Sequence, residues 1–110
     1  MKIIDCTLRE GNQSPNVTWG NKESYYISKG LIDCGVDCIE VGHPYASELD
    51  KSNVNIVTSA NPGCSVLAHA RAVESDVAAV QECGADWVGI FMATNDIARN
   101  FKFKNKSVDD

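Results

Sequence analysis

Short apolar runs alternate with segments of helical periodicity along most of the chain. Four runs have the length and β-branched content of strands, and they lie at residues 2–7, 38–42, 65–70 and 87–93. Helical spacing predicts helices over 22–34 and 75–83 and, less clearly, a short helix within 47–60. Strands separated by helices pair in parallel through right-handed crossovers, so the pattern predicts an α/β fold.

The first predicted helix shows its periodicity most clearly. Tyr26, Ile27 and Leu31 share one face at helical spacing, which predicts that this face packs on the core. Asn21 is the expected N-cap, and Gly35 is expected to end the helix.

Two polar stretches interrupt the alternation. Asn61, Pro62 and Gly63 are expected to stop the helix within 47–60. Residues 99–110 predict a loop that opens another helix at Ser107.

A six-residue repeat supports the βα reading. Residues 34–39, Cys-Gly-Val-Asp-Cys-Ile, are matched 49 positions later by residues 83–88, Cys-Gly-Ala-Asp-Trp-Val. Each copy combines a helix end, a glycine that can adopt positive φ, and the start of a β-branched strand. The repeat therefore marks the return from a helix to the next parallel strand.

Composition narrows the class of protein. A chain of 110 residues with 44% hydrophobic content can bury one core, so residues 1–110 are expected to form one domain. The net charge of −5 argues against general binding to nucleic acid or to an anionic membrane. Five cysteines without a Cys-x-x-Cys pair are expected to be reduced thiols in a cytoplasmic protein. The N-terminus lacks a signal-peptide core, and no apolar stretch approaches the length of a membrane span.

Polar side chains recur once per βα unit, near the ends of the predicted strands. Glu10, Glu40, His69 and Thr94 are separated by 30, 29 and 25 residues. Four parallel strands fit half a TIM barrel or a small flavodoxin-like sheet. The gathering of these groups at the carboxyl ends of the strands favours the barrel, in which that rim carries the chemistry.

The adjacent Arg9 and Glu10 are the strongest chemical signal. They follow the first apolar run and precede Gly11, which predicts a strand that ends in a polar loop bearing a guanidinium and a carboxylate. Glu40 interrupts an otherwise apolar strand face, and a buried ion without a partner is costly. We therefore expect Glu40 to pair with Arg9.

Residues 5–13, Asp-Cys-Thr-Leu-Arg-Glu-Gly-Asn-Gln, followed by Ile-Glu-Val-Gly at 39–42, resemble the DRE-TIM metallolyases. This superfamily includes isopropylmalate, homocitrate and citramalate synthases and hydroxymethylglutaryl-CoA lyase. The resemblance extends through residues 67–71 and 92–94. Glu10, Gln13 and His69 make the chain more similar to the homocitrate-synthase-like branch.

The resemblance implies a metal-dependent condensation of acetyl-CoA with a 2-oxo acid, followed by hydrolysis of the thioester. By position, Glu10 would bind a divalent cation (Mg²⁺, Mn²⁺ or Zn²⁺), Arg9 would stabilise charge on the carbonyl oxygen, and Glu40 would orient Arg9. Gln13, His69 and Thr94 would line the oxo-acid pocket together with Arg9. A full-length protein of this kind is expected to be a homo-oligomer.

The chain departs from the family in one respect. The family's His-x-His metal ligands come from a late strand, and no histidine follows His69. A complete barrel needs roughly 250 residues. We therefore expect an N-terminal half-barrel that is inactive unless a second piece completes it.

Two alternatives to the synthase remain open. One is a lyase or aldolase of the same superfamily, which breaks a carbon–carbon bond with the same arginine. The other is a non-catalytic half-barrel that serves as an assembly module.

Overall fold

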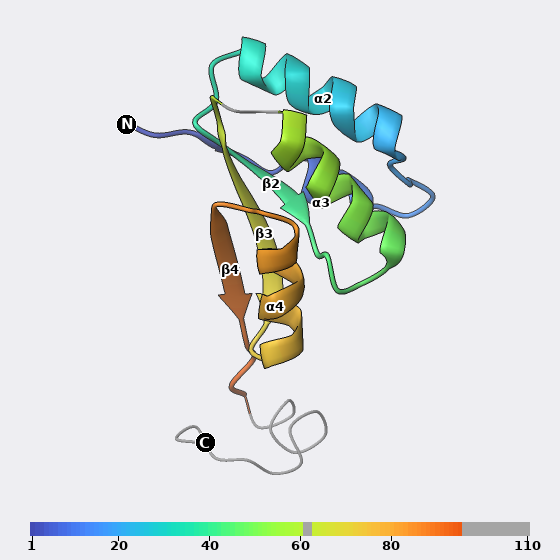
Figure 1. Ribbon diagram of the computed structural model, residues 1–110, viewed down its shortest axis with the longest axis vertical. Helices are drawn as coiled ribbons and strands as arrows, with labels where there is room; N and C mark the ends of the chain where they lie inside the picture. Colours follow the sequence, from blue (N-terminus) through green and yellow to red (C-terminus); the bar gives the residue numbers. More distant parts are fainter. Residues whose placement is uncertain (61–62, 96–110) are drawn as a thin grey trace.

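The computed structural model describes residues 1–60 and 63–95. Strands and helices follow one another in the order β1 (Ile4–Asp5), α1 (Thr7–Asn12), α2 (Asn21–Asp33), β2 (Cys38–Gly42), α3 (Glu48–Ala60), β3 (Ser65–Arg71), α4 (Glu74–Glu82) and β4 (Trp87–Phe91) (Figure 1). The predicted loop and helix start within 99–110, and the predicted stop at Asn61 and Pro62, lie outside the described residues.

The four strands form one parallel sheet in the order β1-β2-β3-β4. A flavodoxin-like sheet would place its first strand between the second and third. The sequential order therefore confirms the predicted α/β half-barrel and excludes the flavodoxin-like alternative.

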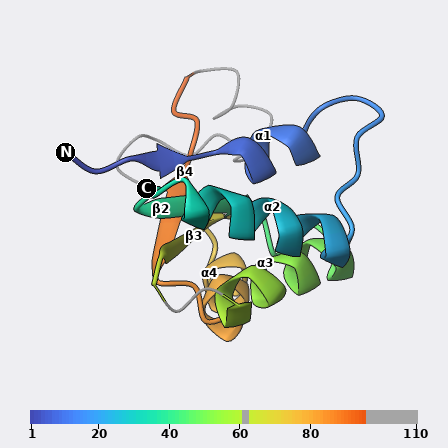
Figure 2. The same cartoon turned by 90° about the horizontal axis from the view of Figure 1, so that it is seen from above.

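Helices α2, α3 and α4 lie on the same side of the sheet (Figures 1 and 2). Alternate residues of β3 enter the core between the sheet and this helical layer, and Val66, Ala68 and Ala70 are buried there. Val54 and Val57 of α3 meet them from the helical side. Leu67 and His69, from the other set of alternate β3 residues, therefore face away from the helices.

Both copies of the six-residue repeat form the same hydrogen-bonded link between neighbouring strands, which we call an aspartate clamp. Gly35 and Gly84 have φ values of 86° and 75°, a conformation that favours glycine, and each reverses the chain after a helix. The aspartate two positions later then forms hydrogen bonds with the backbone near the amino end of the preceding strand. Asp37 accepts a hydrogen bond from Ile3 N–H at 2.7 Å and donates its own N–H to Ile3 O at 3.0 Å.

The second copy reproduces this arrangement one unit further along the sheet. Asp86 accepts from Val66 N–H at 2.8 Å and donates its own N–H to Val66 O at 2.9 Å. The repeated aspartates thus fix β2 beside β1 and β4 beside β3, at the amino ends of the strands.

The largest difference from the sequence prediction concerns the segment after β1. The predicted strand over residues 2–7 is shorter, and the predicted polar loop around Arg9 is the helix α1. Asp5 Oδ1 accepts a hydrogen bond from Thr7 N–H at 2.9 Å, so its side chain turns the chain from strand into helix. Arg9 and Glu10 therefore lie on a helix that directly follows β1.

Two predictions about α2 were also wrong. Its N-cap is Gly20, and Asn21 is the first helical residue. Tyr26 is exposed, whereas Ser24 and Ser28 are buried, because the helix turns a small-residue face toward its neighbours. Ile27 and Leu31 pack against the core as predicted.

No helix in the described ranges is long and apolar enough to cross a membrane.

Candidate active site

An ion pair between α1 and β2 forms the centre of the candidate site. Arg9 Nε lies 2.7 Å from Glu40 Oε2, and both side chains are mostly buried, with exposed fractions of 21% and 17%. This hydrogen bond raises the pKa of Arg9 above its ordinary value, so the guanidinium is permanently charged. The predicted pairing of Glu40 with Arg9 is confirmed.

Two further predicted site residues contact the same guanidinium. Glu10 Oε1 lies 3.0 Å from Arg9 Nη1, and Gln13 Oε1 accepts a hydrogen bond from Nη1 at 3.2 Å. The Glu10 side chain is 61% exposed, unlike its two charged neighbours. Glu10 can therefore turn toward a ligand without breaking the pair between Arg9 and Glu40.

Helix α1 is held in place by contacts on both sides. Leu8 is buried in the core, and Trp19 Nε1 donates a hydrogen bond to Leu8 O at 3.0 Å. Asn12 Nδ2 donates to Asp50 Oδ1 at 2.6 Å, which ties the end of α1 to α3. These contacts fix the position from which Arg9 reaches Glu40.

His69 lies beside this ion pair, as its spacing predicted. Its Nε2 is 3.6 Å from Glu40 Oε1, and the side chain is 21% exposed. The Nε2 atom itself is buried and makes no hydrogen bond within the part of the chain that the structure describes. This ring nitrogen thus faces the same carboxylate that holds Arg9.

His69 also has aromatic neighbours. The ring of His43, from the loop after β2, lies 5.5 Å from the His69 ring and 5.9 Å from that of Phe91. Gly89 leaves room for His69, because a Cβ there would lie 2.7 Å from His69 Nδ1. Gly89, Phe91 and His69 lie on the same face of two paired strands. The two-residue alternation along these strands was the sequence signal that could have indicated the contact.

The pKa of His43 is lowered from its ordinary value of 6.5, chiefly by burial of the ring and further by the positive field of His69 and Arg9. His43 is therefore neutral at pH 7. The neutral His43 ring therefore lines the His69 side of a site whose other residues include the charged Arg9 and Glu40.

Arg71, a second arginine near the rim, is bound elsewhere. Its Nε lies 2.6 Å from Asp76 Oδ2, and its guanidinium stacks 4.6 Å from the centre of the Tyr45 ring. The hydrogen bond from Arg71 lowers the pKa of Asp76. This arrangement fastens the end of β3 to α4 and does not add a cation to the Arg9 cluster.

Thr94, the remaining predicted pocket residue, is exposed beyond the end of β4. Among the contacts of the described residues, none joins Thr94 to Arg9, Glu40 or His69. Its predicted contact with the oxo acid stays a prediction.

The described residues do not make a metal site by themselves. Within residues 1–60 and 63–95, no three histidine, cysteine, aspartate or glutamate side chains gather closely enough to hold a cation. Glu10 offers one exposed carboxylate, and a divalent cation needs several ligands.

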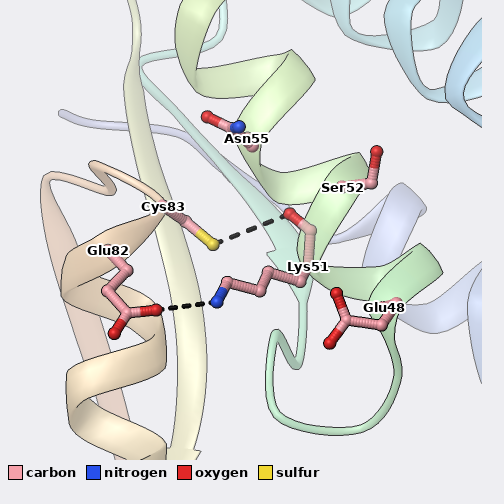
Figure 3. Close-up of a pocket in the computed structure, with 6 residues that line it drawn as sticks. All are labelled: Glu48, Lys51, Ser52, Asn55, Glu82 and Cys83. Atoms are coloured by element: carbon pink, nitrogen blue, oxygen red, sulfur yellow. Dashed lines mark hydrogen bonds and ion pairs between the residues drawn. The ribbon is translucent and has the colours of Figure 1, made fainter.

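A separate pocket lies between α3 and α4 and has a volume of about 220 Å³ (Figure 3). Lys51 and Glu82 form an ion pair across it at 2.7 Å, and the Cys83 thiol points toward Lys51 O at 3.6 Å. None of the predicted site residues lines this pocket. The Lys51–Glu82 pair has the same length as the Arg9–Glu40 pair and lies outside the candidate site, so it can serve as a control.

Comparison with known proteins places the chain in a family. Residues 1–109 match the HMGL-like family. The chain is 35% identical to a homocitrate synthase of Pyrococcus abyssi over 93% of its own length and 28% of the relative's. It is 33% identical to the homocitrate synthase AksA of Methanocaldococcus jannaschii, over 98% of the chain and 27% of the relative.

A third relative carries a different name. The 2-isopropylmalate synthase of the same Methanocaldococcus species is 36% identical over 93% of the chain and 20% of its own length. The chain thus spans between 20% and 28% of the length of these curated relatives. It belongs to the HMGL-like family, within the DRE-TIM superfamily.

Proposed function

We propose that the protein containing this chain is an acyltransferase that condenses acetyl-CoA with a 2-oxo acid. Two relatives are named homocitrate synthases and one a 2-isopropylmalate synthase, which supports this reaction class. The observation that carries the proposal is the Arg9–Glu40 ion pair at the carboxyl end of the sheet. In barrels of this type that end carries the reacting groups.

The condensation requires a fixed positive charge near the carbonyl oxygen of the 2-oxo acid. The enolate carbon of acetyl-CoA bonds to the carbonyl carbon of the oxo acid, and the carbonyl oxygen takes the electron pair as an alkoxide. Arg9 would stabilise that oxygen, since Glu40, Glu10 and Gln13 use Nε and Nη1 in the described contacts and leave Nη2 to donate. Protonation of the alkoxide and hydrolysis of the thioester then release CoA.

The other residues have supporting parts in this proposal. Glu40 orients Arg9, while Gln13, His69 and Thr94 face the oxo acid. Glu10 is proposed as one ligand of a divalent cation, with the other ligands supplied from outside the described residues. Residues 1–110 would form part of one catalytic barrel domain in a cytoplasmic, homo-oligomeric enzyme.

A lyase or aldolase of the same superfamily is the second candidate. Cleavage of a carbon–carbon bond passes through the same alkoxide and enolate in reverse order, so Arg9 would serve equally well. The names of the three relatives favour condensation.

The test uses the complete gene product that includes residues 1–110. The purified protein is incubated with acetyl-CoA, a divalent cation and a panel of 2-oxo acids, and CoA release is followed by chromatography. Arg9→Ala is expected to lower kcat by about 10²–10³-fold, the usual loss when one oxyanion donor is removed.

Lys51→Ala is the matched control. Lys51 also forms an ion pair at 2.7 Å, but with Glu82 at the separate pocket. Its turnover is expected to stay near that of the unchanged protein. CoA release that survives Arg9→Ala would remove Arg9 from the mechanism. Cleavage of a hydroxy-acyl substrate without any condensation would favour the lyase.

A further inference from the structure

Asp50, in the first turn of α3, makes hydrogen bonds to two different segments. Its Oδ1 accepts from Asn12 Nδ2 at 2.6 Å, and Asn12 is the last residue of α1. Its Oδ2 accepts from Ser47 Oγ at 2.6 Å, and Ser47 ends the loop 43–47 between β2 and α3. One carboxylate thus joins α1 to the loop that carries His43.

Capping of α3 alone does not account for this geometry. Ser47 directly precedes α3, and its Oγ accepts the N–H of Asp50 at 3.1 Å, which is half of a capping box. In a complete box the acidic side chain returns to the backbone of the capping residue, so that both contacts stay within one helix. Asp50 instead uses one oxygen on Asn12, and so it holds a second helix as well.

Both of the segments that Asp50 joins reach the candidate active site. Arg9 lies on α1, one turn before the residue that Asp50 holds. The loop carries His43, whose ring lies 5.5 Å from that of His69. Burial is the main cause that lowers the pKa of His43, and the negative charge of Asp50 acts against this lowering. Asp50 therefore links the helix that bears Arg9 to the loop that packs on His69.

The same loop is also fixed by a separate contact. Tyr45 packs against the guanidinium of Arg71 at 4.6 Å, and Arg71 is bound to Asp76 of α4. The Tyr45 ring lies 5.8 Å from that of His43. Since these contacts hold the loop without Asp50, a change at Asp50 is expected to move α1 relative to the loop and not to release the loop.

We propose that Asp50 is a positioning residue for the proposed condensation. Its carboxylate sets how α1, which bears Arg9, lies against the loop that carries His43. This inference rests on the proposed function, because it assigns Asp50 to the reaction in which Arg9 would take part. Asp50 acts through α1 and does not itself touch the substrate. A displacement of about 1 Å at the reacting groups can cost about 10²-fold in rate.

The test again measures CoA release by the complete gene product with the panel of 2-oxo acids. Asp50→Ala is expected to lower kcat by about 10–10²-fold. The effect on KM is expected to be smaller, because Arg9 would stabilise the alkoxide, which forms only during the reaction.

A pair of exchanged side chains tests the link between α1 and α3 directly. Asn12→Asp sets two carboxylates against each other and is expected to lower kcat as Asp50→Ala does. Adding Asp50→Asn to Asn12→Asp exchanges the amide and the carboxylate and restores the hydrogen bond. This double variant is expected to recover most of the lost turnover. Circular dichroism checks that each variant is folded, and if Asp50→Ala does not fold, the comparison of Asn12→Asp with the double variant decides.

Lys51→Ala is the control, since Lys51 is the next residue of α3 and its side chain pairs with Glu82. Its kcat is expected to stay unchanged. Hydrogen exchange gives a readout that needs no turnover. The amides of Glu10 and Gln13, which donate to carbonyls one turn earlier in and around α1, are expected to exchange faster in Asp50→Ala and to be protected again in the double variant.

An Asp50→Ala protein that keeps its kcat, or that loses only thermal stability, would overturn the proposal. So would a double variant that stays as slow as Asn12→Asp. If the unchanged protein turned over no substrate, the proposed function would fail, and exchange in α1 would then decide whether Asp50 holds this helix. Equal exchange rates in Asp50→Ala and in the unchanged protein would show that it does not.

Discussion

Gly11 lies where the indole of Trp19 crosses helix α1. A Cβ at position 11 would lie 2.4 Å from Trp19 Cζ2, closer than real side chains approach. Trp19 could then no longer donate to Leu8 O from its present position. The glycine is thus required because the Trp19 ring closely approaches the backbone of α1, and its φ plays no part.

Gly11→Ala is expected to destabilise the chain by about 1–3 kcal/mol, the usual cost of overpacking. Urea unfolding followed by tryptophan fluorescence measures the change. Gly30→Ala is the control, because Gly30 lies inside α2 with no atom within 4 Å of the added Cβ. That variant is expected to gain about 0.5–1 kcal/mol from helix propensity. Equal effects of the two changes would contradict the packing explanation.

The functional residues differ in how far the sequence could place them. Glu40 stood out because a charge in an apolar strand needs a partner, and Arg9 was the available cation. Phe91 did not stand out, because a ring contact between different strands has no signature in one sequence. The ring of His43 also depends on the register shift between Glu40 and Gly42 of β2, which spacing alone does not predict.

At the scale of elements, the aspartate clamps give the clearest prediction. Asp86→Ala removes the acceptor of Val66 N–H and is expected to cost about 1 kcal/mol, as for a single hydrogen bond. Hydrogen exchange should show faster exchange at the Val66 amide. The Ile3 amide, held by Asp37, should be unchanged.

Asp37→Ala serves as the reciprocal control and should reverse the pattern. If either variant released both amides together, the two clamps would not act independently.

Strands β2, β3 and β4 were predicted nearly to their ends, because β-branched runs and flanking glycines agree there. Helix α1 was missed because it has only six residues and contains Gly11, too little for periodicity to be visible. Helix α3 was underestimated, since its buried Asn53 interrupts the apolar face while its amide donates to Trp19 O at 2.9 Å. The formation of α1 and the full length of α3 depend on tertiary contacts, which the spacing of residues in the sequence does not show.

For the whole molecule, the five cysteines report on the integrity of the core. The structure describes all of them as free thiols, with Cys34 exposed and Cys6 partly so. Burial raises the pKa values of Cys38, Cys64 and Cys83, which keeps these three thiols protonated and shielded.

An aromatic disulfide reagent at pH 8 is therefore expected to modify Cys34 and Cys6 rapidly and the three buried thiols only as the chain opens. The reaction is followed by absorbance, with the unfolded chain in guanidinium as the control that gives all five. Fast reaction of a third thiol in the folded chain would show that the core is looser than described.

Helix α1 also gives the two neighbouring charged residues Arg9 and Glu10 different surroundings. Successive residues of a helix point about 100° apart, so Arg9 turns inward to Glu40 while Glu10 stays in solvent. Shortening Glu10 to aspartate reduces its reach and weakens only its exposed contact with Arg9, whereas a neutral residue in place of Arg9 leaves the mostly buried Glu40 carboxylate without its arginine partner.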